Sequence, residues 1–243
     1  MTGSRDLPTP AVALAIGAHP DDVEFQAGAT LAKWAADGCV VHHLILTDGS
    51  KGTWNPEEDI PALVQSRILE QQAAAKALGA TGQVVMLDNI DGELASGLAE
   101  REQVSYWIRM LQPEVVLGHD PWRRYRLHPD HRHAGWLTLD GVVAARDPFF
   151  FPDQDVPHHR PDALLLFEAD EPDHVEDVTG FEATKIAALL EHRSQFVTTM
   201  AIDDADSGEQ LQTFRDRVFD RMRANGAAHG VTFAEAFKHV DDL

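Results

Sequence analysis

Two short clusters of histidine and aspartate carry the residues of this sequence that are best suited to catalysis. They are His19-Pro20-Asp21-Asp22 and, much later in the chain, His128-Pro129-Asp130-His131. Imidazole nitrogen and carboxylate oxygen bind zinc and also Fe(II), Mn(II) or Co(II), and a catalytic metal usually has three protein ligands with one position open for water. Two clusters that each supply part of such a ligand set are what a hydrolase with a single metal ion requires.

Each cluster also has an ordinary structural explanation. Asp21 or Asp22 would suit the N-cap of a helix, where a carboxylate accepts backbone N–H groups. The chain has 13 histidines, so two histidines spaced three residues apart are weak evidence by themselves. The metal hypothesis gains because His19 and Asp22 could face one point at a strand-to-helix turn, with Asp21 beside the metal-bound water. The position of both clusters after expected strands of one sheet favours it further.

The elements expected around these clusters alternate between strands and helices. Continuous apolar runs predict strands over 11–18, 40–47, 83–87, 114–118 and 163–169, with a short extended segment near 174–178. Helical patterns that end near glycine or proline predict helices over 24–37, 61–78, 98–111, 131–145, 181–192 and 208–225, followed by a short tail. Repeated strand–helix units favour a Rossmann-like, three-layer α/β fold with a mostly parallel sheet. Ligands of such folds bind at the carboxyl ends of the strands.

Composition restricts the partners and the compartment. The length of 243 residues suits one domain, and the loop 146–160 is the nearest approach to a boundary. A formal net charge of −20 argues against nucleic acid and against an anionic membrane surface. The single cysteine, Cys39, and the absence of an apolar leader in residues 1–10 lead us to expect a cytoplasmic protein. A homo-oligomer is left open: the run Phe149-Phe150-Phe151 suits a core position, a lid or a subunit contact, and the core is favoured.

Several motifs of the chain resemble those of the PIG-L/LmbE-like family of zinc-dependent N-acetylglucosaminyl deacetylases. They are the stretches 18–24, 27–30 and 128–131, Thr47-Asp48-Gly49, Arg67 and Glu70 ahead of Leu78-Gly79, and Lys185 followed by His192-Arg193-Ser194-Gln195. The resemblance covers residues 11–196 of a single domain over 1–243, whose part 197–243 is expected to be helical. The chain departs from the pattern at Ala29, where the family often has glycine, and at Arg126, where some members have a mobile tyrosine.

The resemblance implies a role for each residue of the expected site. The ligands of Zn²⁺, or of Fe²⁺ or another divalent metal, would be His19, Asp22 and His131. Asp21 would be the general base, His128 would stabilise the oxyanion or donate a proton, and Asp130 would orient His128. The residues that contact the substrate would be Arg67, Asp91, Phe25 and Arg126. Without the resemblance, Arg67 would be taken for an exposed helix charge and Asp91-Gly92 for a turn.

The expected function is hydrolysis of the N-acetyl amide of a small molecule or conjugate that contains N-acetylglucosamine. The alternatives are a metal-dependent amidase for a non-sugar or thiol-conjugate amide, and a non-catalytic sugar-binding protein on the same scaffold. A phosphoesterase with two metal ions is disfavoured because the sequence offers ligands for one. A dinucleotide-dependent dehydrogenase is excluded because no Gly-x-Gly-x-x-Gly follows the first expected strand.

Overall fold

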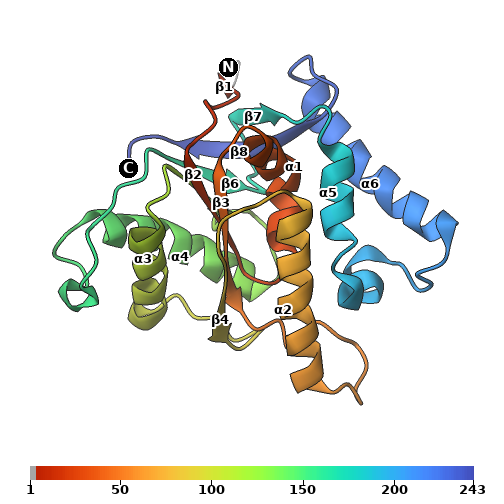
Figure 1. Cartoon of the computed structure of the whole chain (residues 1–243), viewed down its shortest axis with the longest axis horizontal. Helices are drawn as coiled ribbons and strands as arrows, with labels where there is room; N and C mark the ends of the chain where they lie inside the picture. Colours follow the sequence, from red (N-terminus) through yellow and green to blue (C-terminus); the bar gives the residue numbers. More distant parts are fainter. Residues whose placement is uncertain (1–3) are drawn as a thin grey trace.

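A mixed β-sheet forms the centre of the protein. The computed structural model describes residues 4–243, and within that range eight strands join in the order β1-β7-β8-β6-β5-β2-β3-β4 (Figure 1). The strands are β1 Ser4–Arg5, β2 Val12–Gly17, β3 Val40–Thr47, β4 Val84–Asn89, β5 Val115–His119, β6 Ala163–Phe167, β7 His174–Asp177 and β8 Ala234–Val240. Strand β8 runs antiparallel to β6 and β7, while the other neighbours are parallel. The expected mostly parallel α/β fold is confirmed.

Helices cover both faces of this sheet. They are α1 Asp22–Ala36, α2 Ile60–Ala77, α3 Leu98–Leu111, α4 Pro129–Arg146, α5 Glu182–Leu189 and α6 Gly208–Ala227. Figure 1 shows α3 and α4 on one side of the strands and α1, α2, α5 and α6 on the other. Short helical turns occupy Pro152–Gln154, Arg193–Gln195 and Phe196–Met200. Among residues 4–243, none of the helices combines the length and apolar character needed to cross a membrane.

The central strand β2 explains why the first expected strand is apolar throughout. Ala13 and Ala15 pack with α1, α2 and α5, whereas Leu14 and Ile16 pack with α3 and α4. A strand buried on both faces has no solvent side, so its sequence shows no alternation. Its neighbours β3 and β5 are in parallel register with it, and all three strands end at the same edge of the sheet.

The C-terminal part differs from its expected structure. Residues 234–240 form β8, which enters the sheet between β6 and β7, so the prediction of a short tail and of a helical part 197–243 is wrong there. Strand β8 could not be predicted from an apolar run because it contains polar residues. Glu235, for example, is buried by pairing with Lys185 on α5 rather than by apolar packing. The prediction that the run Phe149-Phe150-Phe151 lies in the core is also wrong at Phe149, whose side chain is 90% exposed.

Candidate active site

The polar clusters converge at the carboxyl ends of the central strands. His19 follows β2, Asp91 follows β4, and the second His/Asp cluster begins α4 directly after the loop that leaves β5. They surround a cavity of about 450 Å³, whose walls also include residues of α2, α6 and the loop after β3. Nine of the ten residues expected in the site line this cavity: His19, Asp21, Asp22, Phe25, Arg67, Asp91, Arg126, His128 and His131. The tenth, Asp130, is fully buried behind His19.

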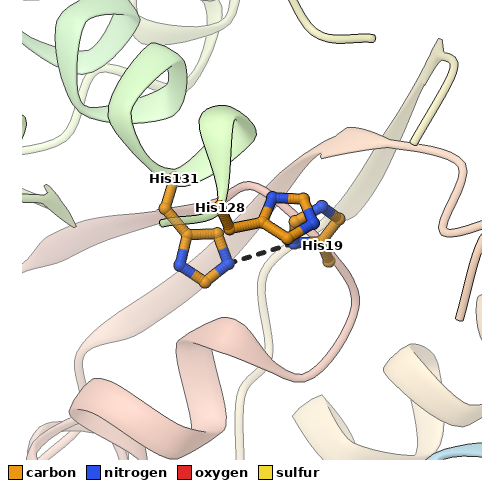
Figure 2. Close-up of side chains that lie close together, drawn as sticks. All are labelled: His19, His128 and His131. Carbon is orange, nitrogen blue, oxygen red and sulfur yellow. Dashed lines mark hydrogen bonds between the residues drawn. The ribbon is translucent and has the colours of Figure 1, made fainter. Parts of the chain in front are cut away.

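Three side chains present donor atoms at distances that suit one metal ion. Nδ1 of His19 lies 3.2 Å from Nε2 of His131, a contact drawn in Figure 2, and 3.4 Å from an Oδ atom of Asp22. The other Oδ atom of Asp22 lies 3.3 Å from Nε2 of His131. Tetrahedral ligands that sit 2.0–2.1 Å from zinc are separated from one another by about 3.3–3.4 Å. The set His19, Asp22 and His131 could therefore hold a divalent cation.

The charges around this set favour a cation. Burial lowers the pKa of His131 to about 3, which leaves the neutral imidazole that binds metals. Burial would raise the pKa of Asp22, but His131 and His119 hold it well below its usual value. Burial would lower the pKa of His19, but hydrogen bonds with Asp130, Asp22 and Asp91 raise it well above the usual value. Three carboxylates are thus concentrated around one imidazole, an excess of negative charge that a divalent ion would balance.

The carboxylates of Asp91 and Asp130 meet at His19. Oδ1 of Asp91 is 3.1 Å and Oδ2 of Asp130 is 3.2 Å from Nε2 of His19, and Gly92 N–H donates to Asp130. A divalent ion would displace the proton of Nδ1, while the acceptors at Nε2 would keep the proton of that nitrogen, so Nδ1 would face the ion. The expectation that Asp130 orients His128 differs from this arrangement, because the Asp130 carboxylate contacts His19. Asp91 contacts the same imidazole and also lines the cavity, so its expected contact with the sugar stays a prediction.

His128 is exposed at the rim of the cavity. Its ring lies edge-on to that of His19, with the centroids 4.6 Å apart, and Figure 2 shows the two rings side by side. Burial and the neighbouring His19 lower the pKa of His128. The ring packs against His19 and His131, and its position at the rim is compatible with a proton donor or an oxyanion contact.

Asp21 has an unusual backbone conformation. Its φ of 97° places it in the left-handed region, where Asp is tolerated better than most residues. It precedes the first residue of α1, and its side chain does not cap that helix. Burial raises the pKa of its carboxyl to about 6, although Arg67, 3.5 Å away, opposes this rise. A carboxyl that titrates near neutrality can both accept and return a proton, as a general base in amide hydrolysis must.

The buried side chain of Arg67 lines the cavity and binds the backbone of two loops. Nη2 donates to the carbonyl oxygen of Pro20 at 2.7 Å, and Nη1 donates to that of Gly49 at 2.8 Å. Arg67, which is expected to contact the sugar, therefore also holds two loops together. Two other predicted substrate residues remain at the cavity wall: Phe25 packs edge-on to Phe214 of α6, and Arg126 donates through Nε to Nδ1 of His131.

Sequence reasoning missed two residues of the site. His119, the last residue of β5, lies 3.3 Å from Asp22 and could replace His19 in a ligand set with Asp22 and His131. Glu168, which follows β6, lies 3.5 Å from His119 and 3.2 Å from Nη2 of Arg126. The available signal was their place at the carboxyl end of a strand, which is the same signal that identified the other clusters.

Comparisons with known proteins find relatives that share sequence with most of this chain. The family profile described as PIG-L: GlcNAc-PI de-N-acetylase matches residues 14–141. The chain is 34% identical to a diacetylchitobiose deacetylase of Thermococcus kodakarensis over 186 residues, which are 75% of this chain and 69% of that protein. It is 29% identical to a 1D-myo-inositol 2-acetamido-2-deoxy-alpha-D-glucopyranoside deacetylase of Streptomyces avermitilis, covering 63% of this chain and 60% of that one.

A solved structure extends the likeness to nearly the whole chain. The N,N'-diacetylchitobiose deacetylase from Pyrococcus horikoshii superposes with a TM-score of 0.85 and 26% identity. The superposition covers 96% of this chain and 84% of that one. The likeness therefore includes the C-terminal part that the family profile does not match.

Proposed function

Because the chain belongs to the PIG-L family, we propose that it hydrolyses the N-acetyl amide of a small molecule that contains N-acetylglucosamine. The observation that carries the proposal is the group of donor atoms of His19, Asp22 and His131, spaced 3.2–3.4 Å apart, with the Asp21 carboxyl in the same cavity. We propose Zn²⁺ as the ion because neutral imidazole and carboxylate suit it, and Fe²⁺ fits the same ligands. The single cysteine supports a reducing, cytoplasmic setting.

Amide hydrolysis requires that a water molecule is activated, that the carbonyl group is polarised and that the leaving amine is protonated. A divalent ion at this site would polarise the carbonyl and lower the pKa of its water to about 7. Asp21 would take the proton of the attacking water, for which its pKa of about 6 is suitable, and Asp21 or His128 would then protonate the leaving amine. His128 would donate a hydrogen bond to the developing oxyanion from the rim. Asp91 and Asp130 would keep His19 in the tautomer that presents Nδ1.

The substrate region of the cavity is polar and open. Beyond the proposed metal ligands, its walls carry Trp54, Gln26 and Arg221, so an aromatic ring face and polar groups are available to a sugar. Aromatic faces such as that of Trp54 pack against the apolar faces of sugar rings. The amide of Gln26 and the guanidinium of Arg221 can form hydrogen bonds with hydroxyl groups. These features support an amino sugar over a purely apolar amide.

Metal content and acetate release would test the proposal together. We would compare the wild type with Asp21→Asn, since Asn tolerates the left-handed backbone that alanine would not. We expect about one divalent ion per chain in both proteins. Acetate release from N-acetylglucosamine or diacetylchitobiose should fall about 10²–10⁴-fold in the variant.

Two results would change the assignment. Bound metal without cleavage of N-acetyl sugars would move the activity to another amide, which is the amidase alternative. Absence of divalent metal from protein purified without chelators would refute the proposed centre.

A further inference from the structure

The peptide group between Pro20 and Asp21 is held at both of its polar ends by one helix. Its carbonyl oxygen accepts from Nη2 of Arg67 at 2.7 Å, and its N–H donates to Oε1 of Gln71 at 3.0 Å. Arg67 and Gln71 are four residues apart on α2, so their side chains leave the same face of the helix one turn apart. Because the C=O and N–H of a trans peptide point in opposite directions, the pair determines how this peptide plane is turned.

The orientation of this peptide plane sets the backbone conformation of Asp21. Rotating the plane about its long axis would carry Asp21 out of the left-handed region, where it has a φ of 97°. A residue other than glycine in that region is disfavoured by local sterics, so it persists only where its surroundings enforce it. Hydrogen bonds to both ends of the peptide provide that enforcement, and the Asp21 carboxyl points into the cavity as a result.

Gln71 is itself held in one orientation by buried partners. Its amide nitrogen donates to Oε1 of Glu24 at 2.8 Å and lies 3.1 Å from Nδ1 of His43. The second carboxylate oxygen of Glu24 is 3.3 Å from Nε2 of His192, and all four side chains are fully buried. Only the amide oxygen can accept from Asp21 N–H and only the amide nitrogen can donate to Glu24, so the Gln71 amide has one possible orientation.

We propose that Gln71 is a positioning residue, which together with Arg67 clamps the Pro20–Asp21 peptide and so aims the Asp21 carboxyl at the attacking water. The proposal rests on the proposed function in its catalytic part, whereas its conformational part stands on the hydrogen bonds alone. Gln71 does not line the cavity, so it acts through Asp21 rather than on the substrate.

The first test is Gln71→Leu, which keeps the approximate side-chain size and removes the hydrogen bonds of Gln71 with Asp21, Glu24 and His43. A displacement of about 1 Å in a catalytic group costs about 100-fold in rate, so kcat should fall about that much, with KM and bound metal unchanged. Leu78→Ala is the matched control, because Leu78 is the C-cap residue directly after the same helix and packs in the core away from the cavity. It should lower the unfolding temperature without lowering kcat.

The second test is an exchange of the two partners. Gln71→Glu alone would place a second carboxylate against Glu24 and should lower kcat as Gln71→Leu does. The double variant Glu24→Gln with Gln71→Glu restores one carboxylate and one amide at 2.8 Å, with an oxygen still facing Asp21 N–H. It should recover kcat to within about tenfold of the wild type. A role in folding alone predicts instead that kcat per folded molecule is unchanged in all of these variants.

Three results would overturn the clamp: an unchanged kcat in Gln71→Leu, a loss of metal in proportion to activity, or no rescue by the exchange. A crystal structure of Gln71→Leu separates the clamp from the proposed function. If the wild type cleaves no amide, the proposed function fails. The backbone conformation of Asp21 in this crystal structure then still tests whether Gln71 holds the Pro20–Asp21 peptide. A φ that becomes negative in the variant supports the clamp, and a φ that stays near 97° refutes it.

Discussion

Replacing Glu235 by glutamine should lower the free energy of unfolding by about 4 kcal/mol. Glu235 lies on β8 and accepts from Lys185 Nζ on α5 and from the backbone N–H groups of Ala29 and Thr30 in the middle of α1, at 3.1 and 2.8 Å. Lys185 also donates to the carbonyl oxygen of Phe25. One buried carboxylate thus connects the last strand with two helices.

The magnitude follows from what the glutamine leaves behind. Lys185 and Glu235 are both 3% exposed, so Lys185 would remain as a buried cation without a counter-charge, which typically costs about 3–5 kcal/mol. The amide can accept from one of the two α1 N–H groups, and the other becomes an unpaired buried donor at about 1–3 kcal/mol. The two costs overlap because they come from one substitution. Burial already lowers the pKa of Lys185 despite Glu235, which shows how poorly this site tolerates charge.

Equilibrium unfolding in urea, followed by tryptophan fluorescence, measures the effect. The matched control is Glu93→Gln, which breaks the ion pair of Glu93 with Lys51 at 2.8 Å, where the side chains are 61% and 52% exposed. The control should leave the midpoint unchanged, because solvent and salt screen such a pair. The double variant Lys185→Met with Glu235→Gln should recover part of the loss. Equal, small effects of Glu235→Gln and Glu93→Gln would refute the reasoning.

Three further predictions concern the helix interface, the buried carboxylate Glu24 and the candidate metal centre. Gly141→Ala should destabilise the protein by about 1–3 kcal/mol in urea unfolding, because the new Cβ would lie 2.5 Å from Cγ1 of Val104; an unchanged midpoint would show that α3 and α4 separate easily. Burial would raise the pKa of Glu24, but hydrogen bonds from two histidines lower it from 4.5 to about 2. A lowered folded-state pKa stabilises above the unfolded-state pKa, so unfolding at several pH values should show Glu24→Gln less stable than the wild type at pH 6 and the difference shrinking as pH falls below 4.5 toward 2; a constant difference would contradict the assignment. Asp130→Asn should weaken metal binding about 10–100-fold in chelator competition, because His19 loses a carboxylate partner, and an unchanged affinity would separate Asp130 from the centre.

The layout of the sheet and the place of the site were predictable from local patterns. Continuous apolar runs reveal strands that are buried on both faces, as in β2 and β5, and helix-forming segments between them require parallel pairing. Parallel pairing then brings the segments after β2, β4 and β5 to one edge of the sheet. The two His/Asp clusters could be placed in one cavity because each follows this rule.

The partners within the site were not predictable in the same way. Asp130 lies two residues from His128 in sequence, yet its carboxylate binds His19 on another loop. Arg67 and Gln71 have the spacing of an exposed helix face, and they are buried because the Pro20–Asp21 peptide gives their polar groups partners. A hydrogen bond between distant segments leaves no periodic trace in either segment.

The sequence by itself determined the residue types for chemistry, the order of strands and helices from β2 to α6, and the edge of the sheet where the clusters meet. The tertiary structure alone decided which carboxylate binds which imidazole, the left-handed conformation of Asp21, and the entry of β8 into the sheet through Glu235. The physical reason is that apolar burial follows a local period that a single segment displays. Buried polar groups, in contrast, are tolerated only once a partner from elsewhere in the chain satisfies them.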